Sequence, residues 1–213
     1  YHTGFVVGEK GIVLFDAPID VDEAKAVRAV IEKAAPGRAI THVVISHVHG
    51  DHVAGLPAHA DAEVLVGAGG VAALRRQLGD RLPARVREVS HAETLELGDR
   101  RIRVLPLASD HAATMLVGFD PASGTLFQGD LFYIPERGAV PIAFSTGREL
   151  ATLIDSNGLD VRTIVGVHGR SGTPADLRGA VARIPARNDR GCVGEQMTGA
   201  VALKSDDEAS IAK

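Results

Sequence analysis

The chain has 213 residues and a formal net charge of −4, with 45% hydrophobic and 23% charged residues. This is the composition of an ordinary globular protein, and a chain of this length buries a sizeable core without disulfides or a structural metal. It carries no basic patch for nucleic acid and no apolar stretch near the ~20 residues of a membrane helix. We therefore expect neither nucleic acid nor a membrane as a partner. The single cysteine, Cys192, excludes an internal disulfide.

The chain begins with Tyr1 rather than methionine, close to a predicted strand over residues 5–7. No signal peptide is recognisable, so we expect a processed or truncated chain. The sequence leaves the compartment open between cytoplasmic and periplasmic or secreted, and it leaves the oligomeric state open too.

The first half of the chain alternates between buried strands and amphipathic helices. A helix is predicted after an N-cap at Asp20 or Asp22, and Pro36-Gly37 ends it. A second, shorter helix is closed by Gly79. In chain order the segments are strand 12–15, helix to 34, strand 42–45, strand 64–66 and helix 71–78.

From about residue 85 to 127 the pattern is mostly strands separated by turns. The later segments are strands 94–97, 101–105, 115–119 and 125–127, helix 146–156, strand 163–167 and a helix after Thr173-Pro174. This order predicts an α/β (α+β) fold in which two sheets pack together with helices outside. We expect one domain over residues 1–186 and a C-terminal tail, 187–213, that is peripheral or poorly ordered.

Three histidines and one aspartate occur within six residues, directly after the predicted strand 42–45: His47, His49, Asp51 and His52. Neutral imidazoles and carboxylates are the usual ligands of zinc and related ions. A loop at this position can turn several side chains toward one point. The alternative is a solvated polar loop whose histidines cap a helix.

Three later residues extend this pattern, because each lies in a loop at the end of a predicted strand. They are His111, Asp130 and His168. Functional side chains often occupy such loops on a rigid scaffold. Taken alone, each has a structural explanation: a turn histidine, a turn aspartate or a core histidine bonded to backbone.

The seven residues together resemble the ligand set of the metallo-β-lactamase fold superfamily, over roughly residues 5–183. The resemblance implies a four-layer αβ/βα sandwich with the site at one edge of both sheets. It also leads us to expect that the family's usual first strands are missing before Tyr1.

The resemblance further implies two Zn²⁺ ions, with iron or manganese as alternatives. One metal would be held by His47, His49 and His111, and the other by Asp51, His52 and His168. Asp130 would bridge the two.

Two departures locate the chain within that superfamily. Many true β-lactamases carry cysteine or serine at the position of Asp130, and the segment around His111 lacks the Gly-His-Thr-Pro-Gly-His-like run of glyoxalase II. We therefore expect a dinuclear hydrolase whose metal-bridging hydroxide attacks a small ester, lactone, thioester or amide. Asp51 is expected to accept the nucleophile's proton. Tyr133 is either a hydrogen-bond donor to the substrate or a packed aromatic residue.

Other functions of the same fold stay open as alternatives. They are a true β-lactamase, an iron-dependent sulfur dioxygenase and a non-enzymatic metal-binding member. A flavodiiron enzyme is disfavoured because the remaining length holds no flavin domain, and a nuclease because no basic groove is evident.

Loops 133–146 and 54–62 are expected to determine specificity. His2 and Thr3 either line the same edge or belong to a frayed terminus. Surface or capping roles are expected for His42, His59 and His91, and residues 67–70 predict a turn rather than a phosphate-binding loop.

Overall fold

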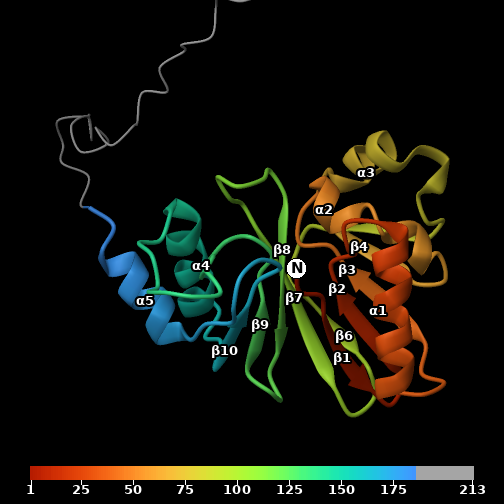
Figure 1. Cartoon of the computed structure of the whole chain (residues 1–213), viewed down its shortest axis with the longest axis horizontal. Coiled ribbons are helices and arrows are strands. Elements are labelled where there is room, and N and C mark those ends of the chain that lie inside the picture. Colours follow the sequence, from red (N-terminus) through yellow and green to blue (C-terminus); the bar gives the residue numbers. More distant parts are fainter. Residues whose placement is uncertain (186–213) are drawn as a thin grey trace, which may run out of the picture.

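Two five-stranded sheets lie face to face, with helices on the outer face of each (Figure 1). This computed structural model describes residues 1–185. The predicted tail and Cys192 lie outside the described residues. Within the described range, no helix is long and apolar enough to cross a membrane.

The first sheet has the strand order β1-β2-β3-β4-β5. A hairpin joins the antiparallel strands β1 and β2, and the other neighbours are parallel. Parallel neighbours need crossover connections, which here contain α1 (Val21–Ala34) and α3 (Gly70–Leu78). The strands are β1 (Gly4–Gly8), β2 (Gly11–Phe15), β3 (Ile40–Val44), β4 (Glu63–Gly67) and β5 (Val86–Val89).

The second sheet has the order β10-β9-β8-β7-β6. Its strands are antiparallel except for the pair β9 and β10, which is parallel and separated in the chain by α4 (Ser145–Ser156). The strands are β6 (Glu93–Glu96), β7 (Arg101–Leu107), β8 (Met115–Asp120), β9 (Thr125–Phe127) and β10 (Thr163–Val165). Helix α5 (Pro174–Ala182) packs beside α4.

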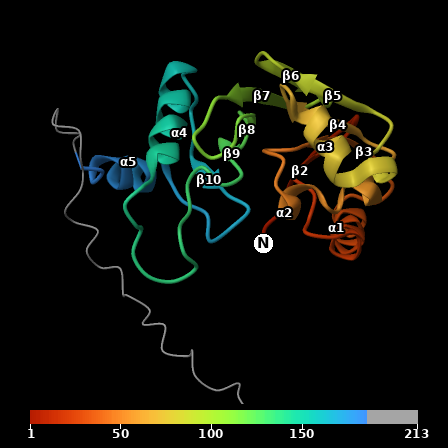
Figure 2. The same cartoon turned by 90° about the horizontal axis from the view of Figure 1, so that it is seen from above.

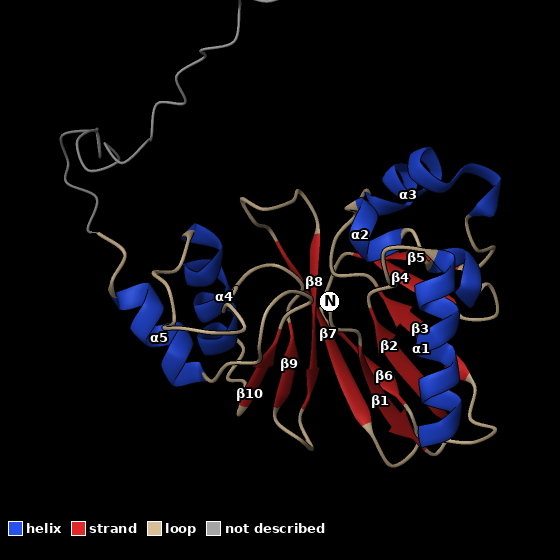
Figure 3. Cartoon of the chain, in the orientation of Figure 1, coloured by secondary structure: helices blue, strands red, loops and turns tan. Residues whose placement is uncertain are grey.

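Alternating side chains of one strand serve two different layers. In β2, Ile12 and Leu14 pack into the core under α1 and α3, whereas Val13 and Phe15 pack into the core between the sheets. A third core lies between the second sheet and helices α4 and α5. The predicted four-layer sandwich is therefore confirmed, and Figure 3 shows its sequence of helix, strand, strand and helix layers.

The predicted helix ends follow from local hydrogen bonds. The carboxylate of Asp20 accepts from the backbone N–H groups of Asp22 and Glu23, which fixes the start of α1. Thr173 and Asp176 form a reciprocal capping box at the start of α5. Gly79 closes α3 with a positive φ of 55°.

Residues 50–62 differ from the expectation of a simple loop. They form the short helix α2 (Gly50–Val53) and the 3₁₀ turn η1 (Leu56–His59), and another 3₁₀ turn, η2 (Gly79–Arg81), follows α3. His59 is fully buried beside Arg28, so its predicted surface role is wrong. Burial and the charge of Arg28 lower the pKa of His59 to about 4, and the ring is neutral near pH 7.

The middle of β8 is a glycine because an aromatic ring occupies the space beside it. Phe15 stacks on Phe127, with ring centroids 4.0 Å apart and planes 7° from parallel. A Cβ at Gly118 would overlap the ring of Phe15.

Replacing Gly118 by alanine is therefore expected to lower the free energy of unfolding by about 1–3 kcal/mol, because the stacked pair must shift. Urea denaturation measures this. Gly179→Ala is the matched control: that glycine lies inside α5 with open space around it, so alanine should raise stability by up to ~1 kcal/mol. Equal effects of the two substitutions would contradict the packing argument.

Candidate metal centre

All seven predicted ligand residues come from segments that follow strand ends at one edge of the sandwich. The segments are the loop after β3, helix α2, the β7–β8 loop, and the loops after β9 and β10. The first two belong to one half of the sandwich and the last three to the other. The N-terminal segment enters between the halves (Figure 2), where the backbone N–H of His2 donates to Val167 at 2.8 Å.

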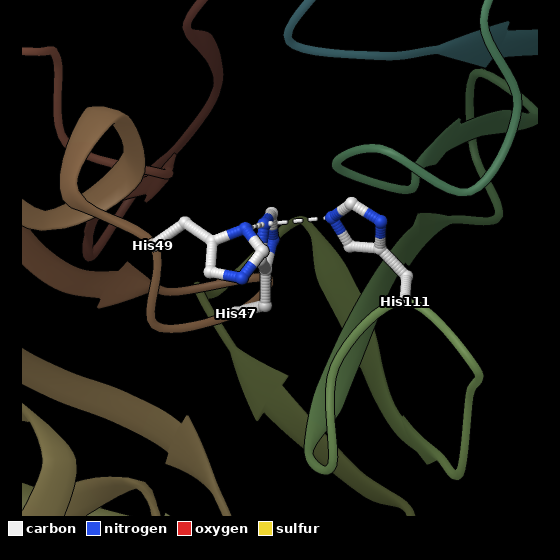
Figure 4. Close-up of side chains that lie close together, drawn as sticks. All are labelled: His47, His49 and His111. Atoms are coloured by element: carbon white, nitrogen blue, oxygen red, sulfur yellow. Dashed lines mark hydrogen bonds between the residues drawn. The ribbon is translucent and has the colours of Figure 1, made fainter.

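The first group of side chains is His47, His49 and His111. The Nε2 atom of His47 lies 2.9 Å from Nδ1 of His49 and 3.1 Å from Nε2 of His111. Figure 4 shows the ring of His111 pointing across from the opposite half toward the other two rings. Three ring nitrogens therefore converge on one point, as a tetrahedral metal site with one open position requires.

The second group is Asp51, His52 and His168. The Oδ2 atom of Asp51 lies 3.2 Å from Nε2 of His168 and 3.6 Å from Nε2 of His52. Asp51 and His52 are consecutive residues of α2, and their side chains meet His168, which comes from the loop after β10. These three form a second cluster with metal-ligating chemistry.

Asp130 lies between the two groups. Its Oδ2 atom is 3.3 Å from Nε2 of His52 and 3.6 Å from Nε2 of His168. The same oxygen is 3.7 Å from Nε2 of His111 and 3.9 Å from Nε2 of His47. A single carboxylate oxygen is thus shared by imidazoles of both groups.

The two buried histidines at the centre have opposite protonation preferences. Burial and the neighbouring charge of His52 lower the pKa of His47 to about 3, which leaves a lone pair free for a cation. Burial also opposes charge on His52, but the nearby carboxylates of Asp130 and Asp16 raise its pKa to about 10. To bind a metal, the ring of His52 must lose the second proton that this raised pKa retains. The same carboxylates that stabilise the protonated ring would also stabilise a metal cation in place of that proton.

Sequence reasoning missed Asp16, which lies directly after β2. Its buried carboxylate accepts from the N–H and the hydroxyl of Ser46 at 2.7 and 2.8 Å, and from Nδ1 of His52 at 3.2 Å. It thereby orients Nε2 of His52 toward the site, as partners of metal-binding histidines do. Asp16 is also the one non-glycine residue with positive φ, 59°, among residues 1–185. No local pattern marks Asp16, because only the pairing of β2 with β3 brings it beside His52.

Two buried polar atoms of the site lack any hydrogen-bond partner within the described chain: Nε2 of His52 and Oδ1 of Asp130. An unpaired buried polar atom is costly and rare in folded proteins. Both atoms belong to the shared centre, and their donor chemistry suits a divalent cation. The residues present therefore fit the metals that the resemblance implies.

A cavity of about 740 Å³ opens beside the site, and Asp130, His111 and His168 form part of its wall. Tyr133 and much of the predicted specificity loop 133–146 line it as expected. The other predicted loop, 54–62, contributes no lining residue. It packs against α1 instead, so its predicted role in specificity has no support in the described cavity.

Tyr1 is a second residue that sequence reasoning missed. Its hydroxyl donates to Oδ2 of Asp51 at 3.2 Å, and its ring meets that of His168 edge-on at 4.6 Å. His2 approaches Glu136 at 3.4 Å. Glu136 lines the cavity, so the position of His2 favours the expectation that it lies at this edge. No local pattern marks Tyr1, because its contacts depend on where the chain enters the sandwich.

Comparisons with known proteins identify the fold and the family. The family model described as the metallo-beta-lactamase superfamily matches residues 2–168. A solved metallo-beta-lactamase from Pontibacter korlensis has a TM-score of 0.69 and 19% identity, with 84% of each chain covered. A flavo di-iron protein from Thermotoga maritima has a TM-score of 0.67 and 19% identity, over 85% of this chain and 52% of that one.

A stereoselective inverting sec-alkylsulfatase from Pseudomonas sp. has a TM-score of 0.63 and 15% identity, over 84% of this chain and 38% of that one. No curated protein matches the sequence. At such identities the solved structures establish the fold alone, whereas the family model covers most of the chain. The chain therefore belongs to the metallo-beta-lactamase superfamily.

Proposed function

We propose that this protein is a dinuclear metal-dependent hydrolase acting on a small ester, lactone, thioester or amide. The observation that carries the proposal is the position of Asp130, whose Oδ2 atom lies within 3.3–3.9 Å of ring nitrogens from both histidine groups. A bridging carboxylate is what holds two cations close together.

In this proposal His47, His49 and His111 hold one cation, and Asp51, His52 and His168 hold the other. Zn²⁺ suits this set of nitrogen and oxygen donors, with Fe or Mn as alternatives. Two such cations would supply a Lewis acid and a hydroxide near neutral pH.

Asp51 is proposed as the proton acceptor. Burial raises the pKa of this carboxyl, but the charge of His52 and the hydrogen bond from Tyr1 lower it below its usual value, so it is ionised at neutral pH. When the water oxygen bonds to the carbonyl carbon, the bond to the leaving group breaks. The proton of the water passes to Asp51 and from there to the leaving group.

Tyr133 is proposed as a hydrogen-bond donor to the carbonyl or leaving oxygen. Its side chain is half exposed and lines the same cavity as Asp130 and His168. Within residues 1–185 its hydroxyl has no hydrogen-bond partner, so the donor is available to a ligand.

β-Lactam hydrolysis is the second candidate, because solved β-lactamases are among the structures that share the fold. The aspartate at position 130 argues against it as the main activity. Turnover of nitrocefin at a rate comparable to that of lactones would make β-lactam hydrolysis the favoured function. An iron-dependent sulfur dioxygenase is distinguished by its metal content and oxygen consumption.

Asp130 should determine how many metal ions the protein holds. The purified chain should hold two divalent ions, and Asp130→Asn should lower this to one or fewer, because the shared oxygen loses its charge. Inductively coupled plasma mass spectrometry measures the content. His91→Gln, at an exposed histidine outside the site, is the control and should keep two ions. One iron per chain together with oxygen consumption would contradict the proposal.

Replacing Asp51 by alanine should reduce kcat by at least roughly 10²-fold, since a positioned acid–base group contributes about 10²–10⁴-fold. Initial rates on a panel of para-nitrophenyl esters, lactones and thioesters give the effect. Circular dichroism should show an unchanged fold, and Asp51→Asn should retain more metal than Asp51→Ala while remaining slow. Undiminished turnover by either variant would rule out the role of Asp51.

Tyr133→Phe removes only the hydroxyl. If this group donates to the substrate, kcat/KM should fall by about 10- to 100-fold, because a hydrogen bond that stabilises charge on the substrate oxygen is lost. The metal content should stay unaltered. If Tyr133 serves only as a packed aromatic, phenylalanine preserves the contact and kcat/KM should change less than about twofold. The second result would overturn the proposed role.

A further inference from the structure

Large apolar side chains are exposed at few places in the described chain, and most of these places are in one cavity. Four of the six line the cavity beside the candidate metal centre, among them Phe144 at 79% and Ile142 at 53% exposure. The six residues are Tyr1, Ile19, Val30, Tyr133, Ile142 and Phe144. Exposed apolar surface gathered in a concave site favours an apolar ligand group there.

The apolar wall belongs to an anchored loop. The guanidinium of Arg183 donates to the carbonyls of Val140 and Pro141 at 2.7 and 2.8 Å. Ala143, between the two exposed apolar residues, is buried, and its N–H donates to Ala180 at 3.2 Å. Ile142 and Phe144 are therefore held outward by a fixed backbone, and the surface exists before any ligand arrives.

The charged residues that line the cavity, apart from its histidines, are all acidic. Asp110 and Glu136 line it, both exposed, in addition to Asp130. Within residues 1–185 no lysine or arginine lines it. A ligand carboxylate away from the metal centre would find no cationic partner and would approach two carboxylates instead, which disfavours it.

We propose that the substrate carries an uncharged apolar group, an alkyl chain of several carbons or an aromatic ring, next to the bond that is hydrolysed. Carboxylate-bearing counterparts are selected against by Asp110 and Glu136. This inference rests on the proposed hydrolase function and specifies its substrate class. Ile142 and Phe144 are its specificity-determining contacts.

The chain provides its own optical probe. It has no tryptophan and two tyrosines, Tyr1 and Tyr133, and both line the cavity. Intrinsic tyrosine emission therefore reports occupancy of this site directly, without any turnover.

The experiment compares two ligands that cannot be hydrolysed on the metal-loaded protein: hexyl para-nitrophenyl ether, and the same ether ending in a carboxylate. Quenching of tyrosine emission, corrected for ligand absorbance, gives both Kd values. The neutral ether is expected to bind at least about 10-fold more tightly, a free-energy difference of about 1.4 kcal/mol. A carboxylate ether that binds equally well or better would overturn the inference.

Variants test the assignment of the contacts. Phe144→Ala should weaken binding of the neutral ether about 5- to 10-fold, since an aromatic side chain buries a large apolar area. Val30→Ala, at a residue of α1 that is 60% exposed and outside the cavity, is the matched control and should change nothing. Glu136→Lys should reduce the difference between the Kd values of the neutral ether and the carboxylate ether. Unchanged binding by Phe144→Ala would contradict the assignment.

Different results would refute the hydrolase function and the apolar substrate class. Selective binding of the neutral ether without hydrolysis of any ester, lactone, thioester or amide would refute the hydrolase function and leave the cavity preference standing. Hydrolysis without that selectivity would refute the substrate class alone. Concentration-dependent dimerisation that Phe144→Ala abolishes, without ether binding, would assign the apolar surface to a second copy and overturn the inference.

Discussion

The stacking of Phe15 on Phe127 is the contact on which the site depends. Each ring belongs to the last residue of its strand, and the pair joins the two sheets at the edge where the candidate ligands gather. Asp16 follows Phe15 directly, and Asp130 lies three residues after Phe127. The carboxylate of Asp16 lies 3.2 Å from Nδ1 of His52 and that of Asp130 lies 3.3 Å from Nε2, so one carboxylate faces each ring nitrogen. Packing between the sheets thus determines geometry that no single loop could maintain.

His52 shows what this arrangement costs. Its two ring nitrogens lie 3.2 Å from Asp16 and 3.3 Å from Asp130, in an environment fully removed from solvent. Burying charge costs several kcal/mol per ion unless it is compensated, and the positive φ of Asp16 adds backbone strain. Such local costs are expected where a site is pre-organised for a ligand. A divalent cation held at this centre would compensate the carboxylates and would satisfy the buried atoms that lack partners.

Much of this fold follows from local patterns, because strands and helices depend on periodicity and capping. The strand end at Phe15 and the cap at Asp20 are examples. The candidate ligand residues can also be recognised in the sequence, because they follow strand ends and together resemble the ligand set of the metallo-beta-lactamase superfamily. Asp16 and the burial of His59 were not visible, because both depend on segments distant in sequence. An aspartate before Ala-Pro has the signature of an ordinary turn, and only the register of β2 beside β3 places it under His52.

The candidate metal site combines buried and accessible side chains. His47 and His52, from the first half of the sandwich, are fully buried, whereas His49 is exposed and Asp51 is 29% exposed. From the second half, His111 and His168 are 27% and 32% exposed and share their loops with the cavity wall. Sequence changes in residues 133–146 would therefore alter the cavity wall without touching the buried rings of His47 and His52.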